Sequence, residues 1–158
     1  MLMLKNIYVV FVIALAFIIS SCGNNSIYDH NQEINNPWKA EQKAEFDFNI
    51  SDTLSAFDFY INIRNTTEYN YSNLYLFIRT DFPDGRYAID TAELFLADLQ
   101  GNWLGSGIGE IKDNQILFRK HGRFPMKGQY KITFEQAMRT VELQGIESVG
   151  IRIDKSEN

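Results

Sequence analysis

The stretch Phe57-Asp58-Phe59-Tyr60-Ile61-Asn62-Ile63-Arg64 decides the fold of this 158-residue chain. Phenylalanine or isoleucine stands at every second position, and mainly polar residues stand between them. Because successive side chains of a β-strand point to opposite faces of the sheet, this alternation predicts a strand with one buried face. The same period of two recurs on both sides of this stretch, which predicts a protein built from strands.

The neighbouring segments predict further strands and at least one hairpin. Residues 46–50 repeat the alternation, whereas residues 73–79 carry apolar side chains on both faces, which predicts a central strand covered on both sides. The sequence Phe82-Pro83-Asp84-Gly85-Arg86 favours a tight turn, because proline presets φ and glycine accepts positive φ. Residues near 75 and 95 are therefore expected to pair. Short extended segments are also expected at 93–97, 114–119, 129–134 and 148–154.

Together these segments predict an all-β fold. The expected architecture is an antiparallel β-sandwich of about eight strands over residues 45–155, either jelly-roll-like or Ig-like. One short helix is expected near residues 135–143, where apolar residues recur and Gly145 follows. The order of the strands within the sheets does not follow from these local patterns.

The N-terminus predicts a lipoprotein signal peptide over residues 1–21. Lys5 is followed by thirteen mostly apolar residues at 7–19, then by two serines and by Cys22, which is the only cysteine. This order is typical of a signal peptide whose cleavage leaves a cysteine that carries acyl chains. Cys22 is therefore the predicted lipidation site, where diacylglycerol and a fatty acyl group such as palmitate anchor the chain to a membrane.

Two other interpretations of the N-terminus are disfavoured. A helix over the thirteen residues 7–19 spans about 20 Å, short of the hydrocarbon core of about 30 Å. A plain secretory signal does not require a cysteine at the cleavage position. The polar residues 22–44 are expected to tether the domain to the anchor, although Ile27-Tyr28, Ile34 and Trp38 could pack as an edge strand.

The composition argues against polyanionic partners. Removal of residues 1–21 leaves 20 acidic and 14 basic residues, one basic residue fewer than the 15 of the full chain. This net negative charge repels nucleic acid, so no nucleic-acid partner is expected. The single cysteine leaves no disulfide within the chain. Stability is therefore expected to come from apolar burial, for which aromatic residues, 14% of the chain, are the main material.

No group of residues predicts a catalytic, cofactor or metal site. The two histidines, His30 and His121, are far apart in the sequence, whereas a zinc site needs several converging ligands. The glycines of residues 105–109 lack the strand–helix context of a nucleophile elbow or a phosphate-binding loop, so they are expected to form tight turns.

Two sets of charged residues leave alternatives open. The acidic pairs Asp81 with Asp84, and Asp98 with Glu110, cannot be ranked as acid–base partners from their spacing. The basic run 119–123 is expected to be a solvated loop between strands, with binding of a phosphate or an acidic partner as the alternative.

Aromatic residues could form a platform on which a sugar ring stacks, or they could fill the core. The candidates are Trp38, Trp103, Tyr60, Tyr69, Tyr71 and Tyr75. Burial is favoured, because a small sandwich without disulfides needs large buried side chains. Exposure of Tyr69-Asn70-Tyr71-Ser72-Asn73 as a loop that meets a protein partner is a third alternative.

Several motifs are similar to those of one family. They are the lipobox that ends at Cys22, Asn73-Leu74-Tyr75-Leu76, the turn Gly101-Asn102-Trp103-Leu104-Gly105-Ser106-Gly107, and the C-terminal Gln136-Ala137-Met138-Arg139 and Leu143-Gln144-Gly145-Ile146-Glu147-Ser148-Val149-Gly150-Ile151-Arg152. With them the chain resembles the GldH gliding-motility lipoproteins of Bacteroidetes over residues 28–153. The resemblance implies a cell-envelope lipoprotein of gliding, a process linked in that phylum to type IX protein secretion. It implies other gliding-motility envelope proteins as candidate partners, no known enzymatic activity, and Cys22 as the lipidated residue.

The residues after Cys22 bear on the side of the membrane that the domain faces. Gly23-Asn24-Asn25-Ser26 has no acidic cluster, which surface-exposed lipoproteins of this phylum commonly carry as an export signal. The outer membrane facing the periplasm is therefore expected. The expected function is that of a non-enzymatic structural or interaction component of the gliding apparatus. A glycan-binding β-sandwich lipoprotein of a polysaccharide-utilisation system is the alternative, and a carboxylate-dependent hydrolase is a third hypothesis.

Overall fold

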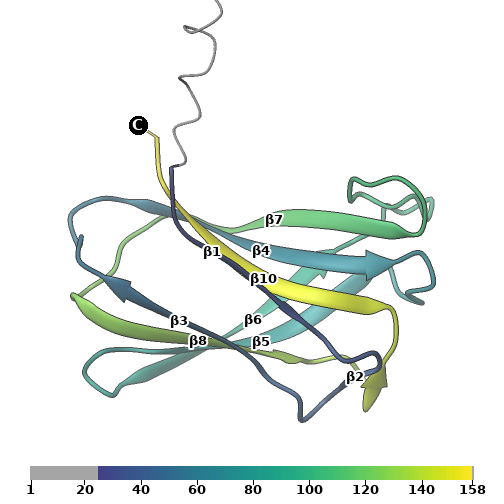
Figure 1. The fold of residues 1–158 in the computed structure, drawn as a ribbon, viewed down its shortest axis with the longest axis horizontal. Helices are drawn as coiled ribbons and strands as arrows, with labels where there is room; N and C mark the ends of the chain where they lie inside the picture. Colours follow the sequence, from purple (N-terminus) through teal and green to yellow (C-terminus); the bar gives the residue numbers. More distant parts are fainter. Residues whose placement is uncertain (1–24, 158) are drawn as a thin grey trace, which may run out of the picture.

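The computed structural model describes residues 25–157, which form an all-β domain, as the sequence predicts (Figure 1). Its strands are β1 (Ser26–Glu33), β2 (Trp38–Lys39), β3 (Ala44–Ile50), β4 (Phe57–Thr66), β5 (Asn73–Asp81), β6 (Tyr87–Phe95), β7 (Ile111–Gly122), β8 (Gly128–Gln136), β9 (Glu142–Leu143) and β10 (Ile146–Lys155). Cys22 and the predicted signal peptide, residues 1–21, lie outside the described residues.

Two four-stranded antiparallel sheets form the layers of a sandwich (Figure 1). One sheet has the order β1-β10-β4-β7 and the other β3-β8-β5-β6, while the short strands β2 and β9 pair separately. In chain order the eight long strands alternate between the sheets except at the β5–β6 hairpin. This order is that of a jelly roll. The structure thus decides between the two predicted architectures.

The alternating stretch 57–64 lies in β4, in the interior of its sheet between β10 and β7. Ile61 and Ile63 are buried in the core, as the period of two predicts. The predicted hairpin is also present: Tyr75 pairs with Glu93, and the pairing of β5 with β6 shows no register shift. Local alternation and turn chemistry were therefore sufficient to place these strands.

Strand β5 has a neighbour on each side in its sheet, but only one of its faces is covered. Leu74 and Leu76 are fully buried, whereas Tyr75 is 37% exposed and Phe77 is 47% exposed. The prediction of a strand covered on both sides is therefore wrong. Apolar residues on both faces of a strand imply two-sided cover only where a second layer exists, and the second layer of this sandwich covers one face alone.

The prediction of a short helix near residues 135–143 is also wrong. Strand β8 continues through Gln136, and a turn leads to β9. The Ala137 N–H donates to the Tyr75 carbonyl at 2.8 Å, and the Gln136 amide donates to the Thr140 carbonyl at 2.9 Å. Because a helix this short forms few internal hydrogen bonds to offset its nucleation cost, contacts with the sheet prevail.

Part of the segment expected as a tether, residues 22–44, belongs to the folded domain. Strand β1 pairs with β10 at the edge of its sheet. Trp38 is fully buried, and its indole N–H donates to the Gln42 carbonyl at 2.8 Å. The folded domain therefore begins before residue 45, with the edge strand that the sequence allowed.

The core lies between the sheets and consists mainly of aromatic and branched aliphatic side chains. The ring of Tyr28 on β1 lies 5.0 Å from that of Phe48 on β3, and the ring of Phe124 lies 5.3 Å from that of Phe57 on β4 and 5.0 Å from that of Tyr130 on β8. Full burial of one large apolar side chain contributes about 1.5–3 kcal/mol. Contacts of this kind between facing strands hold the two sheets together.

Replacement of Phe46 by alanine is expected to destabilise the chain strongly, because Phe46 is fully buried. Lost burial and the remaining cavity together cost about 3–5 kcal/mol for such a change. Phe77→Ala, on the exposed face of β5, is the matched control and is expected to cost less than about 1 kcal/mol. Equilibrium unfolding in urea measures both, and equal losses would contradict the assignment of the buried face.

The Asp58 carboxylate joins the end of β7 to the C-terminal residues. It accepts hydrogen bonds from the His121 N–H at 2.8 Å and from the Ser156 hydroxyl at 2.6 Å. His121 has a φ of 53°, which is uncommon for a residue with a side chain. The bond from the His121 N–H, followed by that from Ser156, holds the pKa of the Asp58 carboxyl below its usual value.

Asp58→Asn is expected to reduce the sensitivity of the fold to acid. A carboxyl whose pKa is lower in the folded than in the unfolded chain stabilises the fold while it is ionised, and this stabilisation is lost as the pH falls below about 4. Urea unfolding at about pH 7 and about pH 3 should therefore show a smaller difference in stability for Asp58→Asn than for the unchanged chain. Equal differences would show that Asp58 has no such role.

Candidate functional site

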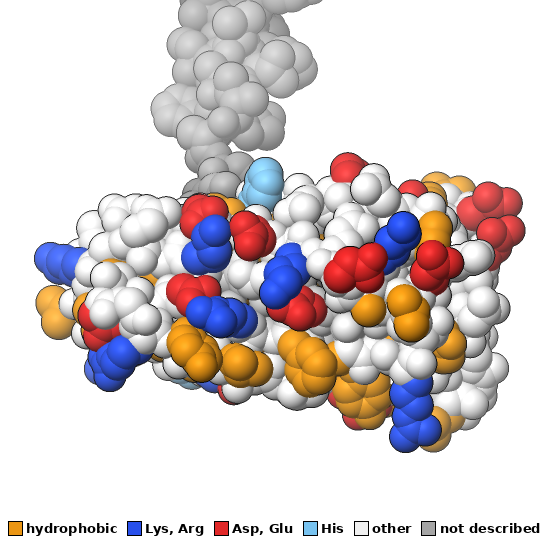
Figure 2. Space-filling view, turned by 90° about the horizontal axis from the view of Figure 1, so that it is seen from below, with side chains coloured by type: hydrophobic (Ala, Val, Ile, Leu, Met, Phe, Trp, Pro, Cys, Tyr) orange, Lys and Arg blue, Asp and Glu red, His pale blue; other side chains and the backbone are white. Residues whose placement is uncertain are grey.

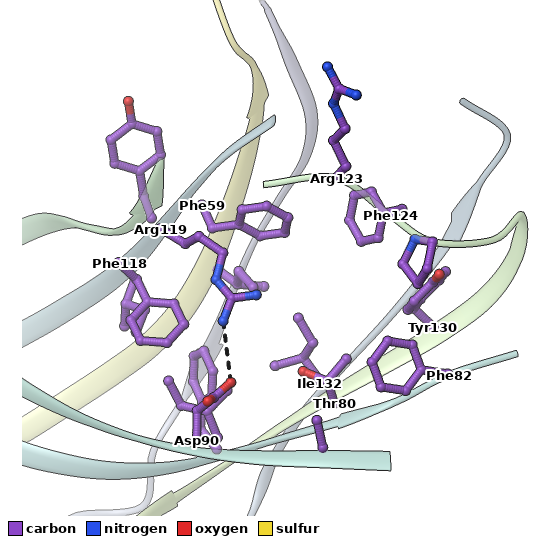
Figure 3. Close-up of a pocket in the computed structure, with 17 residues that line it drawn as sticks. Phe59, Thr80, Phe82, Asp90, Phe118, Arg119, Arg123, Phe124, Tyr130 and Ile132 are labelled. Atoms are coloured by element: carbon purple, nitrogen blue, oxygen red, sulfur yellow. Dashed lines mark ion pairs between the residues drawn. The ribbon is translucent and has the colours of Figure 1, made fainter. Parts of the chain in front are cut away.

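The sandwich is open on the side where β6 and β7 run, because each is the last strand of its sheet. A cavity of about 100 Å³ lies between the sheets there. Side chains from both sheets point into it (Figure 3). Its walls are mainly apolar and include Phe59, Ile78, Phe118, Phe124, Tyr130 and Ile132.

One ion pair spans the mouth of this cavity. The Arg119 guanidinium of β7 lies 3.6 Å from the Asp90 carboxylate of β6 (Figure 3, dashed line). The two side chains are 57% and 47% exposed. An exposed pair contributes only about 0–1 kcal/mol, so it can open without disturbing the sheets.

The deep wall of the cavity is an aromatic cluster. The ring of Phe124 lies 5.3 Å from that of Phe57, 5.4 Å from that of Phe59 and 5.0 Å from that of Tyr130, in tilted or edge-to-face contacts. The Tyr130 hydroxyl donates to the Met126 carbonyl at 2.9 Å, and burial raises its pKa. Because this hydroxyl is already bonded, the wall offers apolar contacts to a ligand.

The cavity was not visible in the sequence. Its lining comes from strands that are far apart along the chain. The only local signal is that β6 directs the small Ala88 and the charged Asp90 inward, where an apolar side chain would otherwise fill the space.

A second surface feature runs along the outer face of the β5–β6 hairpin. We call it the β6 strip, and its exposed side chains are Tyr75, Phe77, Tyr87, Ile89 and Phe95. Figure 2, which views the domain from the side of this sheet, shows hydrophobic side chains gathered along one margin, beside a band of acidic and basic side chains. Contiguous exposed apolar surface marks interaction sites in soluble domains.

The outer face of the other sheet is polar, and a shallow groove crosses it. The Asn62 amide N–H donates to the Asn31 side-chain oxygen at 3.1 Å, and the Asn62 oxygen accepts from the Gln115 amide at 3.2 Å. Arg64 pairs with Asp113 at 2.7 Å. A ligand in the groove would have to break these hydrogen bonds and this ion pair before it could bind the same groups. The groove is therefore a weaker candidate than the cavity.

The structure brings together only part of the aromatic platform given above as an alternative, in which the Tyr69 ring lies 5.7 Å from that of Tyr71. Trp38 and Tyr69 are buried, while Tyr71 and Tyr75 are partly exposed. Trp103 packs against the core, with its ring 6.5 Å from that of Tyr69. The favoured interpretation, burial in the core, is therefore confirmed for Trp38 and Tyr69. The alternative of a sugar platform that includes Trp38 is wrong.

The carboxylates considered for acid–base chemistry have structural partners. Asp81 pairs with Arg79 at 2.7 Å, and Asp98 accepts from the Asn102 N–H at 2.8 Å. Hydrogen bonds from these partners hold the pKa of both carboxyls below the usual value. A general acid needs the opposite shift, so neither group is suited to that role.

The two loop predictions have different outcomes. The basic run 119–123, expected as a loop, instead contains the last residues of β7. It places Arg119 and Arg123 on the lining of the cavity. The glycines of 105–109 form turns as expected, and Gly107 has a φ of 132° that favours glycine.

Within residues 25–157, no three His, Cys, Asp or Glu side chains converge in a way that could hold a metal ion. His30 and His121 lie on different strands, β1 and β7. In the same part of the chain, no helix has the length and apolar character needed to cross a membrane.

Comparison with known proteins gives one consistent family. A family model described as GldH lipoprotein matches residues 26–153. The gliding motility lipoprotein GldH homolog of Christiangramia forsetii is 34% identical over 163 residues, which cover 98% of this chain and 100% of the relative. The gliding motility lipoprotein GldH of Flavobacterium johnsoniae is 28% identical over 149 residues, which cover 90% of this chain and 92% of the relative.

Solved structures add little to this result. An uncharacterized protein from Listeria monocytogenes EGD-e is 11% identical with a TM-score of 0.36, and the match covers 81% of this chain and 11% of that protein. A likeness at this level carries no argument. The family match, by contrast, spans nearly all described residues. The chain therefore belongs to the GldH lipoprotein family.

Proposed function

We propose that this chain is a lipid-anchored, non-enzymatic interaction component of the gliding-motility apparatus. Acyl chains on Cys22 hold it in the outer membrane, with the β-sandwich in the periplasm. The observation that carries this proposal is family membership over residues 26–153. Two relatives of nearly the same length as this chain are named gliding motility lipoproteins, which supports the same process here.

An anchor at Cys22 would keep the domain close to the bilayer. Cys22 stands three positions before Asn25, the first described residue. An extended chain spans at most about 3.6 Å per residue, so these positions are at most about 11 Å apart. The Asn25 carbonyl accepts from the Lys155 N–H at 2.9 Å, which ties this end to β10. The sandwich is therefore held beside the membrane by a short connection.

The described side chains favour binding over catalysis. Asp81, Asp84 and Asp98 are engaged in structural hydrogen bonds, whereas the cavity and the β6 strip present apolar surface. Exposed apolar surface of this kind is typical of contacts between proteins. A glycan-binding role has less support, because Trp38, a candidate for the alternative sugar platform, is buried.

Loss of this protein is expected to abolish colony spreading. A deletion strain that carries the unchanged gene should spread, whereas one that carries Cys22→Ala should not, because the chain then lacks the acylated sulfur. Asp47→Ala, an exposed change on β3, is the control and should restore spreading. Spreading on agar and mass spectrometry of the mature N-terminus are the measurements. A deletion strain that spreads normally, or a bare thiol at Cys22, would contradict the proposal.

Protease treatment of intact cells tests the membrane face. A domain in the periplasm should resist added protease until the outer membrane is permeabilised, and should then be degraded at the same rate as a periplasmic marker. Removal of the domain from intact cells would place it on the cell surface instead.

A further inference from the structure

We propose that the free edge of β6 accepts an extended strand of a partner protein, and that one apolar side chain of this strand enters the cavity between the sheets. This docking mode rests on the proposed function, because it describes how the interaction component binds. The free edge and the cavity lie at the same place, because β6 is an edge strand and residues of β6 line the cavity.

The edge of β6 is a regular template for another strand. β6 pairs with β5 through all nine of its residues without a register shift. In the described part of the chain, no strand pairs with its other side. The sequence of β6 contains no proline. An edge with free N–H and C=O groups can bind an extended segment by strand addition. The inward Asp90, a charge of the kind that protects edges, is here paired with Arg119 of β7.

The edges at β7 and β3 are less suited to this role. At β7, the N–H and carbonyl of Asp113 are bonded to Ser106 at 2.7 and 2.9 Å, and the pairing of β7 with β4 shifts register twice. At β3, the outward carboxylates Glu45 and Asp47 lie 3.2 and 4.0 Å from Lys131. Bulges and outward charges are the features that protect sheet edges from pairing.

The cavity explains what an added strand gains beyond backbone hydrogen bonds. Side chains of a strand alternate between faces, so every second residue of a strand on β6 points toward the gap beneath Asp90 and Ala88. A hydrocarbon-lined cavity of about 150 Å³ holds benzene. The cavity here, about 100 Å³, is smaller and therefore suits one aliphatic side chain of valine or leucine size. Its aromatic walls supply the contacts.

Charge at the mouth selects the residue that flanks the inserted side chain. Besides its exposed pair with Asp90 at 3.6 Å, Arg119 lies near the Phe118 ring, with Cζ 5.9 Å from the ring centroid. Arg123 is on the rim of the site, and its guanidinium points away from the cavity (Figure 3). The Arg119 guanidinium favours a carboxylate on the incoming strand, which would take the place of that of Asp90. The partner segment is thus an extended, alternating apolar strand with an acidic residue beside its cavity-filling side chain.

The β6 strip adds contacts on the outer face of the same segment. Tyr87, Ile89 and Phe95 are each more than half exposed on β6, and Thr91 and Glu93 stand between them on the same face. An added strand places its outward side chains next to this mixed face, where cross-strand pairs form. The outer face of the partner segment is therefore expected to be mixed, and its inner face apolar.

Photo-crosslinking in living cells tests this docking mode. Thr91, exposed on β6, is replaced by p-benzoylphenylalanine in the full-length chain, and Asp47 on β3 is replaced in the same way as the matched site at the other edge of the sheet. A covalent protein adduct is expected at position 91 and at least tenfold less at position 47. Sequencing of the crosslinked peptide should show alternating apolar residues and a nearby acidic residue.

A cavity-filling variant separates strand docking from other contacts. Ala88→Leu fills the cavity from within, so it should lower the yield of the adduct at position 91 at least tenfold while the melting temperature stays equal or rises. Ala88→Val fills less space and should give a smaller loss of adduct, so a folding defect in the larger variant cannot be mistaken for the result.

Several results would overturn the docking mode. They are no adduct at position 91, an adduct to lipid, a crosslinked segment without alternation, or an adduct that Ala88→Leu leaves unchanged. Colony spreading distinguishes this failure from failure of the proposed function. If the deletion strain fails to spread and Ala88→Leu spreads normally, strand docking is wrong while the role in gliding stands.

Discussion

Face-to-face packing of two sheets is the constraint on which the rest of this structure depends. The chain has one cysteine, so no internal disulfide holds the layers together. Contacts between the sheets, such as that of Tyr28 on β1 with Phe48 on β3, must do so. A sandwich of this kind buries the inner faces of both sheets but leaves the outer edge of each edge strand without a neighbouring strand. The edges of β6 and β7, and the cavity between them, are a direct result of that arrangement.

The parts of the fold that depend on neighbours in sequence could be predicted. The alternation over residues 57–64 and the turn at 82–86 report the geometry of one strand and one hairpin, and both are present. Strand order could not be predicted, because it depends on which distant segments meet. Two errors have the same origin: the helix near 135–143 loses to sheet contacts, and Phe77 is exposed because only one face of β5 has a covering layer.

The candidate site was largely outside the reach of sequence reasoning. Residues from most of the long strands line the cavity, and no local pattern joins Phe118 of β7 to Ala88 of β6. Trp38 is fully buried, as the favoured interpretation predicted, because a large aromatic side chain in a small domain is most valuable in the core. Processing enzymes recognise the motif that ends at Cys22 as a short sequence, so lipidation can be predicted without knowledge of the fold. Lipidation of Cys22 remains a prediction.

The polar groups of the described residues mostly bond to one another, whereas the apolar side chains Tyr87, Ile89 and Phe95 on β6 are more than half exposed. This contrast favours a role in binding. Hydrogen–deuterium exchange tests that account most directly. It compares backbone amides of residues 87–95 in the purified full-length chain and in the chain retained in isolated cell envelopes, with residues 44–50 as the internal reference. The account predicts slower exchange of residues 87–95 in the envelope and equal exchange of residues 44–50. Equal exchange of residues 87–95 in both states would contradict it.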